Sequence, residues 1–425
     1  MTSETSADQA FVWVWLPGHA EPVVAGRLRL WGKSVLGFTY GRSYLERDDA
    51  VPLYLPELPL ERGNLRPPDG MDVAGCIRDA APDAWGQRIV LRRLAGRAAD
   101  GGDTTQLPLL TYLLVSGSDR AGALDFQHSA TEYVPREQGG TLEHLLSAKE
   151  RFEAGGLQPT PVDVALLLGS SIGGARPKAT LIDGDRSLIA KFSSTTDTYP
   201  VVKAEAVAMD LARQVGLSAA LTELVEVVGR DVLLVERFDR EAPHGPRRMF
   251  VSALTILELH EDLGRYATYF DLADQIRSRF TDRAGTLREL FARITFNILV
   301  GNTDDHARNH AAFWDGEMLT LTPAYDVCPQ LRSGGEAAQA MAIRRDGFRM
   351  AQLSGCVAGA REYELTEREA RDIVDAQAET IRECWDDAAD RARLTMAERD
   401  ALWGRQILHP YAFHDYPARA SGAPG

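Results

Sequence analysis

The most informative stretch of the sequence is Phe296-Asn297-Ile298-Leu299-Val300-Gly301-Asn302-Thr303-Asp304-Asp305-His306-Ala307-Arg308-Asn309-His310. It begins as an apolar helix and runs into a loop with two acids, two histidines and two asparagines. Downstream, beyond a predicted hairpin, comes Leu321-Thr322-Pro323-Ala324-Tyr325-Asp326. Loops favour Asp, Asn and Gly for conformational reasons alone. The spacing of the polar groups, however, indicates a site of chemistry.

Asp304 and Asn309 have the spacing of the Asp and Asn in a protein-kinase catalytic loop. In that arrangement the carboxylate accepts the proton of an attacking hydroxyl, and the amide holds a divalent cation. Asp326 lies where a second, metal-holding Asp is expected. Mg²⁺ suits such a site, because it prefers a few carboxylate oxygens together with substrate phosphates. The pattern therefore predicts phosphoryl transfer.

A metal hydrolase is the alternative for the same loop. Asp304, Asp305, His306 and His310 include the residue types that ligate zinc or a pair of metals. The Asp-to-Asn spacing and the absence of a second His/Asp cluster in the sequence count against this interpretation. A solvated or capping role is the simpler expectation for either histidine.

Upstream, a lysine follows an apolar strand in Leu188-Ile189-Ala190-Lys191-Phe192. A lysine at such a position can pair with nucleotide phosphates and with a glutamate of the next helix, for which Glu205 is the candidate. The alternative is a solvated lysine at a strand edge. Its place before a helix and upstream of Asp304 favours the phosphate-binding interpretation.

Residues 169–178 form a loop of small residues that matches neither G-x-G-x-x-G nor the Walker pattern, because Ala175 occupies the lysine position of the latter. Small residues such as Gly173 let backbone N–H groups approach phosphates, and Lys178 adds charge. Phosphate added to Ser170 or Ser171 would repel the nucleotide that this loop covers.

The segment Glu236-Arg237-Phe238-Asp239-Arg240 closes a predicted strand before a linker. Backbone groups at such a connection can recognise adenine, and Phe238 can pack on the base. An aromatic residue that ends a strand more often packs in the core.

Composition narrows the class of protein. A chain of 425 residues predicts two or three lobes, and its 44% apolar and 25% charged residues are ordinary for a globular enzyme. The net charge of −14 argues against nucleic acid as a direct partner and favours a basic protein. No apolar run is long enough to span a membrane and no signal core is visible, so a cytoplasmic location is expected. The four cysteines lie far apart, which predicts reduced and mostly buried thiols.

The pattern of apolar residues predicts an α/β first part, a hairpin over 179–192, a helix over 202–215 and two strands over 221–238. After about 250 the pattern is helical except for the hairpin, and capping boxes at Thr366 and Thr395 open two late helices. The expected organisation is a disordered tail (1–10), an N-terminal α/β subdomain (11–160), a β-rich nucleotide-binding part (161–240) and a helical C-terminal lobe (241–425).

With these segments assembled, the chain resembles the HipA family of serine/threonine kinases, the toxins of HipBA-type toxin–antitoxin modules. The resemblance runs through nearly the whole chain and is carried by five segments, 79–86, 171–178, 235–240, 302–309 and 321–326. It implies an α+β, protein-kinase-like bilobal fold with an α/β N-terminal part and an all-helical C-terminal lobe. It also implies use of ATP and Mg²⁺.

The resemblance assigns roles residue by residue. Asp304 would be the catalytic base, and Asn309 and Asp326 the Mg²⁺ ligands. The cofactor-binding residues would be Lys191, Glu236, Phe238, His306 and Ser171, to which the composition of the small-residue loop adds Gly173 and Lys178. Lys191 and Asn309 are expected, with Asp304, to be catalytic. Ser171 would be the inhibitory autophosphorylation site, with Ser170 as a second candidate.

The family implies a small helix-turn-helix antitoxin as partner. The implied substrate is a protein of the translation machinery, such as an aminoacyl-tRNA synthetase. Asp305 departs from the glycine often found after the catalytic Asp, and it adds charge beside the expected metal. The segment 251–257 departs from some members after the hinge, which leaves the substrate open. A catalytically weak corepressor of the antitoxin and a small-molecule kinase are the alternative functions.

Overall fold

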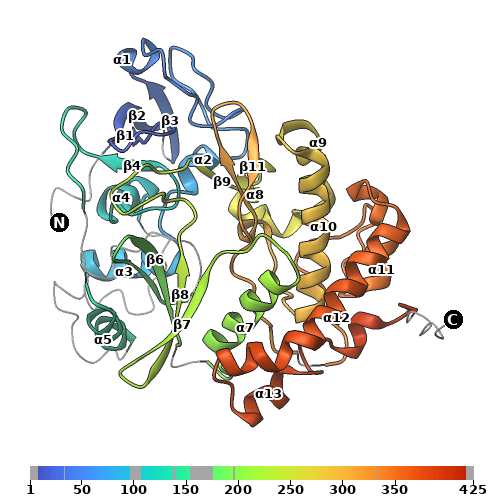
Figure 1. Ribbon diagram of the computed structural model, residues 1–425. Helices are drawn as coiled ribbons and strands as arrows, with labels where there is room; N and C mark the ends of the chain where they lie inside the picture. Colours follow the sequence, from blue (N-terminus) through green and yellow to red (C-terminus); the bar gives the residue numbers. More distant parts are fainter. Residues whose placement is uncertain are drawn as a thin grey trace. The chain divides into compact units, whose positions relative to one another are not determined.

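A computed structural model describes residues 8–32, 34–95, 107–136, 140–153, 176–194, 197–332 and 334–417. The chain divides into two compact units (Figure 1). Unit 1 contains Met1–Thr198, Leu221–His260 and Ala311–Thr320, and unit 2 contains Tyr199–Ala220, Glu261–His310 and Leu321–Gly425. The four-part organisation expected from the sequence remains a prediction.

Unit 1 opens with a four-stranded antiparallel sheet in the order β3-β2-β1-β4. Its strands are β1 (Gln9–Val14), β2 (Val23–Trp31), β3 (Val35–Tyr40) and β4 (Leu124–Gln127). Alternate residues such as Val12, Leu28 and Phe38 are buried, so one face of the sheet packs inward. The helices α1 (Arg42–Leu45) and α4 (Leu109–Val115) contact this sheet. Between them in the sequence come α2 (Gly75–Arg78) and α3 (Ala84–Ala95).

A second four-stranded sheet has the order β5-β6-β8-β7. Its strands are β5 (Lys178–Asp183), β6 (Arg186–Phe192), β7 (Thr222–Val227) and β8 (Arg230–Glu236). The turn between β7 and β8 has positive φ at Val228 and Gly229, as a type I′ hairpin requires. The hairpin and the two strands that the sequence predicts are confirmed.

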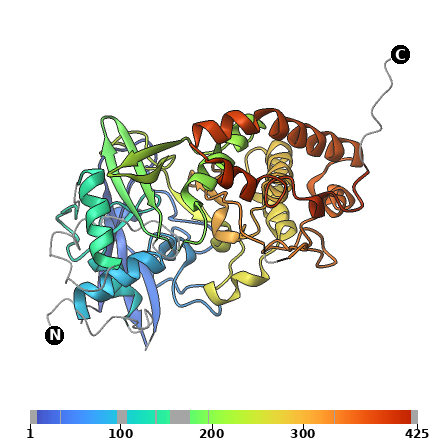
Figure 2. The same cartoon turned by 90° about the horizontal axis from the view of Figure 1, so that it is seen from below.

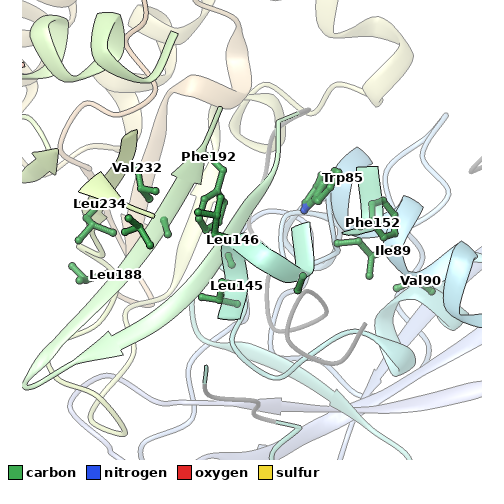
Figure 3. Close-up of a cluster of buried hydrophobic side chains, with 14 of the residues drawn as sticks. Trp85, Ile89, Val90, Leu145, Leu146, Phe152, Leu188, Phe192, Val232 and Leu234 are labelled. Carbon is green, nitrogen blue, oxygen red and sulfur yellow. The ribbon is translucent and has the colours of Figure 1, made fainter. Parts of the chain in front are cut away.

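One hydrophobic cluster joins this sheet to three helices (Figure 3). Leu188, Ala190 and Phe192 of β6 contribute from alternate positions, and Trp85 of α3 packs edge-on against Phe152 of α5 (Leu142–Glu153). Because side chains alternate along a strand, the residues between these positions on β6, including Lys191, lie on the other face of the sheet. The cluster therefore determines which face carries Lys191.

A small sheet completes unit 1, with the order β11-β10-β9. It is formed by β9 (Phe250–Ser252), β10 (Ala311–Trp314) and β11 (Leu319–Leu321), and α8 (Ala253–Ile256) follows β9. Asp79 accepts hydrogen bonds from the backbone N–H and the hydroxyl of Ser252, which fixes the start of α8 to the segment after α2. The expectation that the chain after 250 contains no strand besides the hairpin is wrong at β9.

Unit 2 is built from helices. They are α7 (Val201–Gln214), α9 (Tyr269–Arg279), α10 (Arg283–Val300), α11 (Leu353–Ala358), α12 (Glu367–Arg391) and α13 (Met396–Leu402), with short 3₁₀ turns between them. α7 and α12 pack against each other (Figure 2). Both predicted capping boxes are present, at Thr366 and Thr395. No helix among the described residues is long and apolar enough to cross a membrane.

α10 ends at Gly301, which has a left-handed φ of 74°. A Cβ built there would lie 2.6 Å from the carbonyl oxygen of Gln406. At Gly216, after α7, φ is also positive, at 85°, but a Cβ would meet nothing within 4 Å. Gly301 and Gly216 therefore share a left-handed φ and differ in whether a Cβ would meet a neighbouring backbone, so alanine substitutions at the two positions can be compared directly.

We expect Gly301→Ala to lower the free energy of unfolding by about 2–4 kcal/mol, since it combines left-handed strain with a backbone clash. Gly216→Ala should cost about 1 kcal/mol from conformation alone. Urea denaturation of both variants measures the difference. Equal losses would mean that the contact with Gln406 is unimportant.

Candidate functional site

The loop between α10 and β10 holds two of the predicted site residues. Asp304 is exposed, whereas Asn309 is 8% exposed at the end of the 3₁₀ turn Ala307–Asn309. The Asn309 amide nitrogen donates to the backbone carbonyl of Asp304 at 3.1 Å. This bond fixes which way the amide faces, so its oxygen points away from that carbonyl and can act as a ligand.

Asp326 is linked to the same loop through the residue before it, Tyr325. The Tyr325 hydroxyl donates to the carbonyl of Arg308 at 2.7 Å, and Arg308 immediately precedes Asn309. Asp326 itself has a φ of 59°, which is uncommon outside glycine and is concentrated at functional sites. Unit 2 thus brings together the segments that hold Asp304, Asn309 and Asp326.

A buried polar network lies beneath the loop. The Asp305 carboxylate accepts from the Tyr269 hydroxyl at 2.5 Å and from the Asn297 amide at 2.8 Å. It also lies 2.9 Å from Nε2 of His310. Burial raises the pKa of Asp305, but the His310 ring and the hydrogen bonds from His310 and Tyr269 outweigh it and lower the pKa overall.

This network corrects two expectations from the sequence. His310 is 2% exposed and bound to Asp305, so a solvated or capping role is wrong. Asp305 is 3% exposed, and its carboxylate is hydrogen-bonded within this network, whereas the adjacent Asp304 is exposed. Among the described residues no group of three or more His, Cys, Asp or Glu is placed to hold a metal, which gives the zinc alternative no support. The five-residue spacing of Asp305 and His310 was the available signal for their pairing.

In unit 1, the two predicted lysines face each other. Lys191 on β6 is the direct antiparallel partner of Lys178 on β5. Like charges directly opposite on a sheet are unfavourable unless an anion or a carboxylate offsets them. Lys178 lies 3.8 Å from the carboxylate of Asp83, the residue before α3, and both side chains are buried. A phosphate-sized anion is a chemically suitable further partner for this lysine pair.

Burial raises the pKa of Asp83 to about 6, against the lowering effect of Lys178. A raised pKa means that the folded state holds the proton more tightly than the unfolded state. The contribution to stability is therefore fully present below about pH 4 and is lost as the pH rises through about 6. Between low and high pH, this contribution to the free energy of unfolding changes by about 3 kcal/mol.

We expect the Asp83→Asn variant to lack this pH dependence, because its amide never ionises. Asn also retains the cap that Asp83 provides to the backbone N–H of Gly86 at 2.7 Å. Urea unfolding at pH 4.5 and pH 7 for both proteins isolates the effect. If the free energies of unfolding of wild type and Asp83→Asn differ by the same amount at both pH values, Asp83 is not the source of the pH dependence.

The predicted hinge begins where β8 ends at Glu236. Phe238 is half-buried and packs edge-on against Phe313, with a centroid separation of 5.8 Å, and beside Phe250. Packing therefore accounts for part of its surface. Arg237, next to it, is buried, and its guanidinium bonds Asp239, Asp119 and the carbonyl of Arg120.

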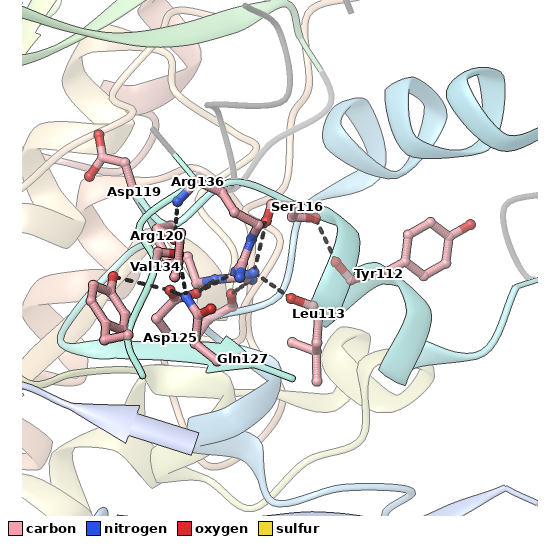
Figure 4. A network of polar contacts seen from close by, with 12 residues as sticks. Tyr112, Leu113, Ser116, Asp119, Arg120, Asp125, Gln127, Val134 and Arg136 are labelled. Carbon is pink, nitrogen blue, oxygen red and sulfur yellow. Dashed lines mark hydrogen bonds and ion pairs between the residues drawn. The ribbon is translucent and has the colours of Figure 1, made fainter. Parts of the chain in front are cut away.

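Arg120 extends this ionic network into the first sheet (Figure 4). Its guanidinium is fully buried and bonds the Asp125 carboxylate at 2.9 Å and the carbonyls of Ala80 and Leu113. Arg136 reaches the same carboxylate at 2.8 Å. The hinge segment is thus fixed to β4 and the N-terminal helices by charged hydrogen bonds, which sequence reasoning missed because no local pattern marks them.

The remaining predicted residues divide into two groups. His306 is half-buried in the loop, and Glu205 is buried on α7. Ser170, Ser171 and Gly173 lie outside the described residues, so their roles remain predictions. All four cysteines are free, and Cys76, Cys328 and Cys356 are buried, as the sequence predicts.

Comparison with known proteins identifies relatives. The HipA-like C-terminal domain family matches residues 170–385, half of the chain. Putative kinase Y4mE of Sinorhizobium fredii is 27% identical over 410 residues, covering 84% of this chain and 88% of that protein. The serine/threonine-protein kinase toxin HipA of Shewanella oneidensis is 25% identical over 185 residues, covering 37% and 42%.

The fold has a solved counterpart. The structure of the Shewanella oneidensis toxin–antitoxin complex of HipA, HipB and operator DNA contains a chain that matches with a TM-score of 0.63. The match covers 93% of this chain and 96% of that chain at 18% identity. The predicted fold class, α+β with the architecture of this family, is confirmed.

Proposed function

The chain belongs to the HipA family, and from this premise we propose that it is an ATP- and Mg²⁺-dependent serine/threonine protein kinase. The observation that supports the proposal most strongly is that two hydrogen bonds join Asp304, Asn309 and the Asp326 segment within one unit. An exposed carboxylate, an oriented amide and a second aspartate are the three groups that phosphoryl transfer needs on the side of the hydroxyl and the metal.

In the proposed mechanism, Asp304 accepts the proton of the substrate hydroxyl as that oxygen forms its bond to the γ-phosphorus of ATP. The bond from that phosphorus to the β,γ-bridging oxygen breaks in the same step, and ADP leaves. The amide oxygen of Asn309 and the carboxylate of Asp326 would hold Mg²⁺. This donor set fits the ion, which takes few protein oxygens and leaves the remaining positions to phosphates and water. When bound, Mg²⁺ supplies charge neutralisation at the phosphates. Lys178 and Lys191, opposite each other on β5 and β6, would bind those phosphates.

The role that we propose for the kinase activity in the cell is based on the relatives. We propose that the protein is a toxin that arrests growth by phosphorylating a translation-related protein, that it acts in the cytoplasm, and that phosphorylation of Ser171 or Ser170 silences it. A HipB-like antitoxin is the proposed partner, by analogy with the HipA–HipB complex. The net charge of −14 supports contact with the protein partner, without direct contact to nucleic acid.

Incubation of the purified protein with ATP and Mg²⁺ should add a single phosphate, seen by intact mass and mapped to Ser170 or Ser171. The phosphorylated protein should then bind ATP more weakly, because the added charge repels the nucleotide. A Ser170→Ala/Ser171→Ala variant is the control. The same assay is repeated with a dephosphorylated sample and with a mixed library of Ser/Thr peptides. If neither the protein nor any peptide gains phosphate in either sample, the kinase assignment is wrong. The corepressor alternative then takes its place.

A further inference from the structure

The contact between Asp305 and His310 joins two residues that each directly follow a proposed site residue in the sequence. Asp305 immediately follows the proposed base Asp304, and His310 immediately follows the proposed ligand Asn309. The two pairs therefore have the same spacing and are offset by one residue. One pair carries the chemistry, and the other is buried with an Nε2–Oδ2 distance of 2.9 Å.

The buried pair is fixed to two helices. Asn297 donates to Asp305 from α10, and Tyr269 donates to it from the first residue of α9. The Tyr269 ring also lies edge-on to the His310 ring, with centroids 5.8 Å apart. Nδ1 of His310 is buried without a hydrogen-bond partner, so Nε2 carries the ring's polar contact. Charge-assisted bonds of this kind in a low-dielectric interior are strong and directional.

Holding these two residues inward constrains their neighbours. Successive side chains of an extended chain point to opposite sides, and Asp305 is buried while Asp304 is exposed. His310 has extended φ and ψ of −118° and 139°, directly after Asn309. If the buried contact were lost, the loop could rotate and move both site residues at once. Misplacement by about 1 Å costs phosphoryl transfer about 100-fold.

We propose that Asp305 and His310 form a loop clamp, a pair of positioning residues that hold Asp304 and Asn309 in the geometry for phosphoryl transfer. This inference rests on the proposed kinase function. It goes beyond that function by assigning a role to the acid that stands where a glycine is often found. The clamp touches neither substrate nor metal and acts through its neighbours in the chain.

The kinetic test uses phosphate transfer to a mixed Ser/Thr peptide library. Asp305→Ala should lower kcat about 100-fold and change the KM for ATP much less, because Lys178 and Lys191 are untouched. The Mg²⁺ concentration for half-maximal rate should rise, because Asn309 is displaced. His310→Gln, which offers an amide donor near the position of Nε2, should retain more activity than His310→Leu. The double variant Asp305→Ala/His310→Leu should lose little beyond either single change.

The matched control is Thr295→Val on the same helix α10. It removes the buried bond from Thr295 to Gln377 at 2.8 Å, a bond in which neither clamp residue nor Asn297 or Tyr269 takes part. It should lower stability and leave kcat and the Mg²⁺ midpoint unchanged. If Thr295→Val loses kcat as Asp305→Ala does, or if Asp305→Ala keeps wild-type kcat, the positioning role is wrong.

A second readout needs no kinase activity. Amide hydrogen exchange of residues 302–310 should be faster in Asp305→Ala and in the milder Asp305→Asn than in wild type, and unchanged in Thr295→Val. Unchanged exchange in both Asp305 variants would overturn the clamp whatever the enzyme does. Faster exchange in a protein whose wild type transfers no phosphate would instead overturn the proposed function and leave the clamp standing.

Discussion

Asp304→Asn is expected to lower the rate of phosphoryl transfer about 10²–10⁴-fold, the usual contribution of a general base. Asparagine has nearly the same size but cannot accept the proton of the hydroxyl. The side chain is exposed and its backbone carbonyl still accepts the bond from Asn309, so the fold should remain intact. Initial rates with a Ser/Thr peptide library, together with thermal unfolding, separate the two effects.

The control for this variant is Asp372→Asn on α12. Asp372 is an exposed acid of the same unit, and the substitution makes the same change in charge. It should leave both the rate and the unfolding temperature at the wild-type values. Wild-type activity in Asp304→Asn would refute the assignment of the base. Equal loss in both variants would point to net charge as the cause.

Asp239→Ala is expected to produce the largest loss of stability, about 3–5 kcal/mol, because it removes one of the two carboxylates, Asp119 and Asp239, that pair with the buried Arg237 and Arg240. The carboxylate accepts from Arg237 at 2.8 Å, from Arg240 at 3.0 Å and from the backbone of Gly122 at 2.7 Å. Burial raises the pKa of Asp239, but the two arginines lower it far more, so the group is held as an anion. Urea denaturation measures the change in the free energy of unfolding.

Asp183→Ala provides the comparison within unit 1. Asp183 also pairs with an arginine, Arg186 at 2.6 Å, but its side chain is 58% exposed. Exposed ion pairs contribute at most about 1 kcal/mol, so this variant should be close to wild type. Similar losses in the two variants would show that the buried network contributes no more than a surface pair.

Local patterns in the sequence predicted most of the helices and strands, whereas the roles of the loop residues remain predictions. The capping boxes and the apolar face of α10 are periodic signals within single helices, and the Asp304–Asn309 spacing lies within one short loop. The hairpin partners Lys178 and Lys191 also come from neighbouring strands. Each of these features is set by residues close together in the chain.

The contacts that support the site are long-range and were not predicted. Asp119 and Gly122 meet Arg237 and Asp239 more than a hundred residues later. Tyr269 reaches Asp305 from a different helix. Nothing in local composition distinguishes these polar residues from solvated ones, because their burial is decided by the packing of whole elements. The strand β9 was missed for a related reason, as its short apolar run also suits a buried helix.

The contact of Gln406 with Gly301 joins a segment that is synthesised late to one that is synthesised about a hundred residues earlier. The backbone N–H of Leu408 also donates to the carbonyl of Leu299, in the last turn of α10. The start of the proposed catalytic loop is therefore completed by a segment translated long after Asp326. A nascent chain, or one truncated between these points, carries every proposed chemical group without the support of that loop. For a protein whose proposed activity halts growth, we therefore expect activity to arise only after the helical unit has been almost entirely translated.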